Sequence, residues 1–139
     1  MRFSTHLIFD GQCREAFEFY APLLDAKIVT MLKFGESPLA EKVPPEWQPR
    51  ILHATLERGS FTLFGSDAFP DGYVSPRGFS VTLGVDGFDQ TKKVFDALSD
   101  AGRILLPLQR TFWSGGFGML IDRFGIPWEI NCEQPAGVS

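Results

Sequence analysis

The sequence predicts an α+β protein built from two tandem βαβββ modules. Apolar residues alternate with polar or small ones in the segments 117–122 and 128–133, which is the period of paired strands. Two other segments have apolar residues at helical spacing. The pattern Phe3–Gly11 also recurs as Phe79–Gly87, with Phe, Ser, Leu, Asp and Gly in register. A pattern present twice indicates duplication, with module 1 at about 1–66 and module 2 at about 78–133 of a single domain, 1–139.

Module 1 begins with a strand over Arg2–Phe9. Its alternation places one set of side chains on a packed face (Phe3, Thr5, Leu7, Phe9) and the other on an open face (Ser4, His6, Ile8). The next elements are a helix at about Gln12–Leu24 and strands at Lys27–Phe34, Ile51–Glu57 and Phe61–Gly65. Four prolines between Gly35 and Arg50 prevent regular pairing, so we expect an irregular loop there.

Module 2 repeats this order after a linker. A strand at Phe79–Val85 precedes a helix at about Asp89–Ala101, with Asp89 as the expected N-cap and Gly102 as the residue that ends the helix. The remaining strands are expected at Ile104–Leu108, Phe117–Asp122 and Trp128–Cys132. Gly125 can adopt a positive φ, which favours a tight turn between the last two strands.

Composition narrows the possible partners and location. A net charge of −4 and a pI of about 5.1 argue against nucleic acid or an anionic membrane as partner. No apolar run approaches the roughly 20 residues of a membrane span, and no signal-peptide core follows Met1. Cys13 and Cys132 lack metal-type spacing and are interpreted as buried thiols. We therefore expect a cytoplasmic protein.

The faces not covered by the two helices carry polar side chains. A face this polar does not suit a core, because buried polar groups need partners. Two sheets that meet on such faces would enclose a polar groove suited to a small molecule or a metal ion. The residues predicted on these faces are Ser4, His6, His53, Thr55, Ser80, Thr82, Glu129 and Asn131.

Several separated segments give the chain a family resemblance. They are Phe9–Tyr20, Val43–Trp47, Gly78–Val81, and above all Asp122–Trp128 followed by Ile130–Cys132. With the duplicated module, they resemble the vicinal oxygen chelate superfamily of glyoxalases, bleomycin-resistance proteins and dioxygenases, in its PhnB-like branch. The resemblance implies a glyoxalase-like fold and a homodimer. The branch often carries a demethylubiquinone methyltransferase label, but the chain has no glycine-rich strand–turn–helix motif for S-adenosylmethionine, and we expect no nucleotide cofactor.

The resemblance also implies where a divalent metal would bind. Superfamily metal enzymes take one ligand from the first strand and one from the last strand of each module. Glu129 falls at the last-strand position of module 2, whereas the first-strand positions fall on Ser4 and Ser80, with His6 two residues beyond Ser4. The segment Phe61–Gly65 has neither carboxylate nor imidazole. The four-ligand pattern is therefore incomplete, and His6 with Glu129, joined by His53, is the metal site that the sequence can offer.

Other roles for the same residues stay open. His6 or His53 could act as a general base near pH 7, with Glu129 as the third catalytic candidate, or the two histidines could only hydrogen-bond within the groove. Thr82 and Asn131 are candidates for substrate binding. The remaining substrate-binding candidates are aromatic: Phe112 and Trp113 as a lid on the groove, and Trp47 as a residue that closes over a ligand or anchors its loop.

Two function hypotheses follow. The first is a metal-assisted enzyme that acts on a small carbonyl or aromatic compound. The second is a non-catalytic protein that binds and sequesters a small molecule, as bleomycin-resistance relatives do. The missing ligand on the strand Phe61–Gly65 favours the second hypothesis, and the presence of His6 and Glu129 on open strand faces favours the first.

Overall fold

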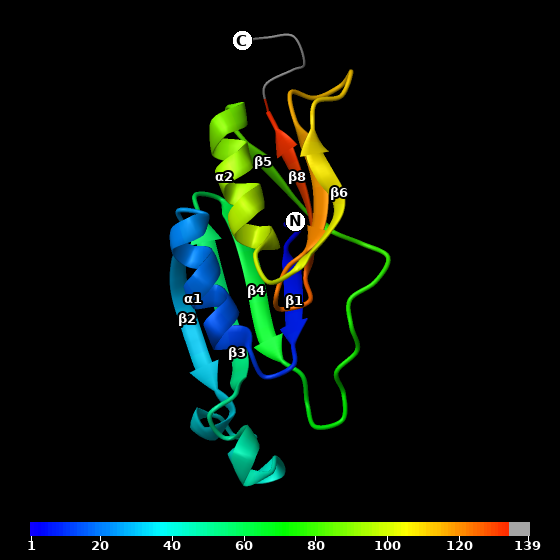
Figure 1. Cartoon of the computed structure of the whole chain (residues 1–139). Coiled ribbons are helices and arrows are strands. Elements are labelled where there is room, and N and C mark those ends of the chain that lie inside the picture. Colours follow the sequence, from blue (N-terminus) through cyan, green and yellow to red (C-terminus); the bar gives the residue numbers. More distant parts are fainter. Residues whose placement is uncertain (134–139) are drawn as a thin grey trace. The chain divides into compact units, whose positions relative to one another are not determined.

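The computed structural model describes residues 1–133, and the chain divides into two compact units, Met1–Val74 and Ser75–Ser139. Each unit contains one helix and one four-stranded mixed sheet (Figure 1). The predicted α+β class with two βαβββ modules is therefore confirmed. No helix among the described residues is long and apolar enough to cross a membrane.

Unit 1 has the strand order β1-β4-β3-β2. Its elements are β1 (Thr5–Phe9), α1 (Cys13–Leu23), β2 (Lys27–Lys33), β3 (Ile51–Arg58) and β4 (Phe61–Asp67). Strand β1 pairs in parallel with β4, and the other neighbours are antiparallel. This arrangement makes β1 an edge strand and places β4 between β1 and β3.

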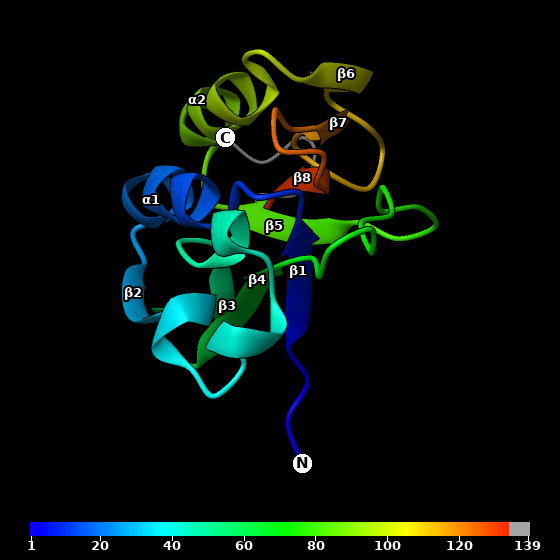
Figure 2. The ribbon, with the colours of Figure 1, turned by 90° about the horizontal axis from the view of Figure 1, so that it is seen from below.

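Unit 2 repeats the arrangement with the order β5-β8-β7-β6. Its elements are β5 (Val81–Val85), α2 (Phe88–Ser99), β6 (Arg103–Gln109), β7 (Phe117–Ile121) and β8 (Pro127–Cys132). Strand β5 is parallel to β8, as β1 is to β4. Figure 2 shows α2 beside the strands β7 and β8 of the same unit.

The proline-rich segment between β2 and β3 forms three single 3-10 turns, Phe34–Glu36, Ala40–Lys42 and Pro45–Trp47. They gather at one end of the unit 1 sheet (Figure 1). Buried Asp67 secures this end, because its two carboxylate oxygens accept the backbone N–H groups of Cys13 at 2.9 Å and Ile51 at 2.8 Å. The carboxylate thereby ties the start of α1 and the start of β3 to the end of β4.

Each helix packs on its sheet through a phenylalanine that fits over a strand glycine. A Cβ atom at Gly65 would lie 2.6 Å from the ring of Phe17, and one at Gly118 would lie 2.6 Å from the ring of Phe95. Both rings are almost fully buried. Since any other side chain would occupy the ring's place, these glycines set the distance between helix and sheet.

The turn between β7 and β8 is held by Asp122. Its Oδ1 accepts the backbone N–H groups of Phe124 and Ile126, and its Oδ2 accepts the indole N–H of Trp128 at 2.9 Å. Gly125 has φ 88°, as the sequence predicted. Arg123 pairs with Asp100 at 3.1 Å, so the Asp122–Arg123 pair has a structural role in this turn.

Several local predictions were wrong. Strand β1 begins at Thr5, and Phe3 is 94% exposed because it lies before the paired segment. Asp89 lies inside the first turn of α2, and Gly87 holds the N-cap position. Ala101, with φ 60°, takes the left-handed position that follows α2. Gly102 is small for another reason, since a Cβ there would lie 2.3 Å from the backbone oxygen of Ile121.

The close contacts of Gly65 and Gly118 with phenylalanine rings predict that substitution of either glycine lowers the stability of the fold. Gly65→Ala and Gly118→Ala should each lower the free energy of unfolding by roughly 1–3 kcal/mol, because the added methyl group displaces a packed ring. Chemical denaturation measures this loss. Gly84→Ala is the matched control, since the atoms nearest to a Cβ there belong to the side chain of exposed Glu133, which can move. Equal stability of all three variants would contradict this account of the packing.

Candidate functional site

Two histidines and a phenylalanine form a cluster on the face of the unit 1 sheet opposite α1. Strand register sets His6 beside Phe64 and Phe64 beside Thr55. The ring centroids of His6 and His53 lie 6.3 Å apart, and that of Phe64 lies 6.4 Å from His6 and 5.5 Å from His53. The structure thus brings the two predicted histidines together. We call His6, His53 and Phe64 the ring cluster.

Hydroxyl groups orient both imidazoles of the ring cluster. The Nε2 atom of His6 lies 2.8 Å from Ser66 Oγ, and that of His53 lies 3.2 Å from Thr55 Oγ1. Burial lowers the pKa of His6 below its ordinary value of 6.5, and the neighbouring charge of His53 lowers it further. His6 is therefore mainly neutral at pH 7, and a neutral imidazole can accept a proton or bind a ligand through its lone pair.

Trp47 lies elsewhere in unit 1 and anchors its loop. Its indole N–H donates to the backbone oxygen of Ala68 at 2.9 Å. The guanidinium of Arg50 stacks on its ring at 3.9 Å from the centroid. These contacts correspond to the loop-anchoring alternative for this residue, and closure over a ligand stays a prediction.

The open face of the unit 2 sheet holds Glu129 and Thr82 side by side. The two residues are register partners on β8 and β5, and the Thr82 hydroxyl donates to Glu129 Oε2 at 3.0 Å. Met119 faces Glu129 from β7 on the other side. Glu129 is half-buried, so its carboxylate keeps acceptor capacity beyond the bond to Thr82.

Asn131 supports the loop that carries the aromatic lid candidates. Its side-chain amide lies 2.6 Å from the hydroxyl of buried Ser114, which also lies 2.8 Å from the backbone oxygen of Gly116 and accepts the N–H of Gly116. This anchor fixes the loop just after Phe112 and Trp113, which are 93% and 57% exposed. Their rings lie 4.8 Å apart, and Trp113 lies 5.9 Å from Phe117.

Strand register shows which residues lie beside the predicted metal ligand Glu129 and its equivalent in unit 1. In unit 2 the partner of Glu129 on the first strand is Thr82, and the corresponding pair in unit 1 is Phe64 with His6. Ser4 and Ser80 stay the predicted first-strand ligand positions. The equivalent of Glu129 is Phe64, and the first-strand partners of these two residues are Thr82 and His6. Two of these four positions carry ligand-type side chains. No group of three His, Cys, Asp or Glu suited to a metal occurs within residues 1–133.

Strand β4 runs further than predicted and does contain a carboxylate, Asp67. Both of its oxygens are engaged by the backbone N–H groups of Cys13 and Ile51, and the side chain is 3% exposed. Asp67 is thus a structural residue. Because Asp67 lies outside the segment Phe61–Gly65, the prediction that this segment offers no metal ligand is unchanged.

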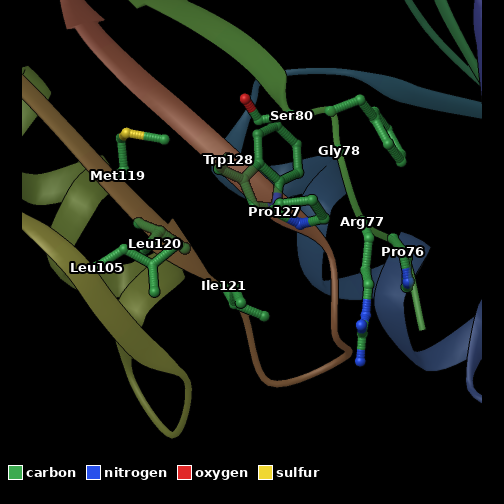
Figure 3. A pocket seen from close by; sticks show the side chains of 11 residues that line it. Pro76, Arg77, Gly78, Ser80, Leu105, Met119, Leu120, Ile121, Pro127 and Trp128 are labelled. Carbon is green, nitrogen blue, oxygen red and sulfur yellow. The ribbon is translucent and has the colours of Figure 1, made fainter.

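An open cleft of about 480 Å³ lies on the unit 2 sheet (Figure 3). Its walls are mainly apolar and come from β6, β7 and β8 together with the segment before β5. The lining side chains include Arg77, Phe79, Ser80, Leu105, Met119, Ile121 and Pro127. We call this the unit 2 cleft.

Sequence reasoning missed Phe64, Ser66, Ser114 and the cleft residues. Ser66 could have been found from the repeat, because it occupies the position of Asn131 once the pairs β1–β4 and β5–β8 are superposed. Ser114 gave no signal, since a serine between an aromatic pair and two glycines is typical of any flexible loop.

The repeated sheets and their helix-free polar faces define a glyoxalase-like protein. Solved structures with the same fold include a glyoxylase/bleomycin resistance protein/dioxygenase domain from Frankia sp., which shares 13% identity and a TM-score of 0.66 over 96% of this chain and 98% of its own. This likeness concerns the fold alone.

Closer similarity shows the family. The model of the family described as 3-demethylubiquinone-9 3-methyltransferase matches residues 1–131, and the chain belongs to this PhnB-like family of the vicinal oxygen chelate superfamily. It is 36% identical to Protein YjdN of Escherichia coli over 97% of this chain and 99% of that protein. Protein PA1353 of Pseudomonas aeruginosa shares 42% identity and a TM-score of 0.88, covering 96% and 98% of the two chains. A PhnB protein from Bacillus cereus shares 25% identity and a TM-score of 0.75, covering 95% and 99%.

The burial of His6 and the nearby charge of His53 predict the pKa of the His6 imidazole. Its pKa in the folded protein should lie below 6.5, so the stability associated with its neutral form is complete above pH 6.5 and is lost as the pH falls through the folded-state pKa. In His53→Gln the pKa should rise part of the way back, because burial, the larger cause, remains. NMR titration of the imidazole C–H resonances measures both values. A His6 pKa of 6.5 or higher in the unmodified protein would refute the prediction.

Proposed function

We propose that this chain is a small-molecule-binding protein that holds an aromatic or amphipathic compound on the helix-free faces of its sheets. One observation carries the proposal. In each unit the helix covers one face, while the other gathers hydrogen-bonding side chains next to partly exposed rings. The pairs His6–Ser66 and Thr82–Glu129 illustrate this, since both connect side chains and leave donor or acceptor capacity for a ligand.

We do not propose the methyltransferase activity named in the family description. The turns from β1 to α1 and from β5 to α2 each contain one glycine, Gly11 and Gly87, whereas dinucleotide-type and S-adenosylmethionine-type turns are glycine-rich. A cytoplasmic location and a homodimer, both expected from the sequence and its resemblance, are part of the proposal. The free, buried thiols of Cys13 and Cys132 are compatible with a reducing compartment.

Titration with 2-naphthol, an uncharged aromatic probe, tests small-molecule binding. We expect saturable shifts in the NMR amide signals of open-face residues such as His53 and Glu129, unaffected by a chelator. Trp113→Ala should weaken binding roughly fivefold, because it removes a ring from the face. Phe61→Ala, which removes a 76% exposed ring at the start of β4, is the matched control. Absence of saturable shifts would refute the proposal.

Light scattering on the same sample should give a molar mass of twice 15.5 kDa, because the proposed protein is a homodimer.

A metal-assisted enzyme is the second candidate, favoured because His6 and Glu129 occupy two of the four register-equivalent positions. Phe64 and Thr82 at the other two positions do not fit the complete ligand set, so we derive no catalytic step through a metal ion.

Metal analysis of protein purified without added metal or an affinity tag tests the second candidate. This candidate predicts about one equivalent of Zn, Ni, Mn or Fe per chain, because catalytic metal sites bind tightly through protein side chains. The metal should be lost in both His6→Ala and Glu129→Ala. His53→Ala then reports whether the second histidine is a third ligand. No metal above background, and none taken up on addition, would eliminate the metal enzyme.

A further inference from the structure

The unit 2 cleft has an apolar floor with a defined direction along the sheet. Met119 and Ile121 are two residues apart on β7, so both point to the open face, and Phe79, Leu105 and Pro127 complete the lining. Figure 3 shows Ile121 and Arg77 toward one end and Met119 toward the other. The two ends differ in charge.

Two arginines mark the Ile121 end. Arg77 lines the cleft, and strand register places Arg103 opposite Ile121 on β6. Neither guanidinium forms an ion pair with any carboxylate within residues 1–133. The other arginines of unit 2 are engaged, since Arg110 stacks on the ring of Phe88 and Arg123 pairs with Asp100. Among the described residues, the arginines of the Ile121 end therefore have no carboxylate partner, in a chain whose net charge is −4.

The Met119 end leads to a hydrogen-bond acceptor. Met119 is the register partner of Glu129, whose partner on β5 is Thr82. Pro127 and Glu129 are two residues apart on β8, a spacing of about 7 Å along a strand. The open-face positions of Pro127 and Ile121 are therefore about 7 Å along the strands from those of Glu129 and Met119.

We propose that the unit 2 cleft binds a small amphipathic carboxylic acid. The carboxylate pairs with the Arg77 guanidinium, whose fork of N–H groups matches two carboxylate oxygens, and Arg103 adds positive charge at the same end. The apolar body lies on Phe79, Met119 and Ile121, where it displaces water from apolar surface. A hydroxyl or amine at the far end can donate to Glu129. This inference rests on the proposed function and names the class of ligand.

Titration with 4-phenylbutyrate tests this proposal, with 4-phenylbutanamide as the uncharged probe of the same shape. We expect saturable shifts in the amide signals of Phe79, Met119 and Ile121, and binding of the amide about tenfold weaker, because it lacks the charge-assisted hydrogen bonds. Arg77→Gln should weaken binding of the acid about tenfold and leave binding of the amide nearly unchanged. Arg58→Gln, the same exchange on an exposed arginine of unit 1, should change neither.

The outcomes separate this inference from the proposed function. Equal binding of acid and amide, or an Arg77→Gln variant that binds the acid as well as the unmodified protein does, overturns the carboxylate assignment. Shifts caused by 2-naphthol without any by 4-phenylbutyrate at the cleft also overturn the assignment and leave the proposed function standing. If neither probe binds anywhere, both proposals fail. The amide spectrum of each variant also shows whether it is folded.

Discussion

Each unit depends on one packing contact, in which a phenylalanine ring of the helix lies against a glycine of a strand. Phe17 over Gly65 and Phe95 over Gly118 let the helix approach its sheet closely enough to exclude water from that face. Each unit has a single helix, so only one face of its four-stranded sheet can be covered this way. The other face must remain compatible with water or a ligand, which accounts for its polar side chains.

The duplicated register explains how the two open faces diverged. The same two positions carry His6 and Phe64 in unit 1 but Thr82 and Glu129 in unit 2. In unit 1 a hydroxyl from Ser66 orients the imidazole, and in unit 2 the hydroxyl of Thr82 orients the carboxylate. One backbone arrangement thus supports an aromatic, weakly basic surface in one unit and an acidic surface beside an apolar cleft in the other.

Carboxylates in this protein serve two distinct purposes, and burial separates them. Asp67 and Asp122 are 3% exposed, and each accepts at least two hydrogen bonds that join chain segments. Such groups stabilise the fold because removal would leave buried N–H groups unsatisfied. Glu129 is only half-buried, and the Thr82 hydroxyl donates to one of its two oxygens, so the carboxylate can still interact with a ligand. The sequence alone does not distinguish these aspartates from Glu129.

The sequence by itself determined the elements and their repetition, because strand alternation, helical spacing and the turn at Gly125 are local properties of neighbouring residues. It also placed His6, His53, Thr82 and Glu129 on open faces. Tertiary structure decided which of these side chains meet. His6 contacts Ser66 across 60 residues and Thr82 contacts Glu129 across 47, and both contacts depend on strand order and register. A shift of register by one residue would turn each side chain to the opposite face, so no local pattern can fix such pairs. The unit 2 cleft was missed for the same reason, since its walls come from three strands and a linker that only the folded sheet brings together.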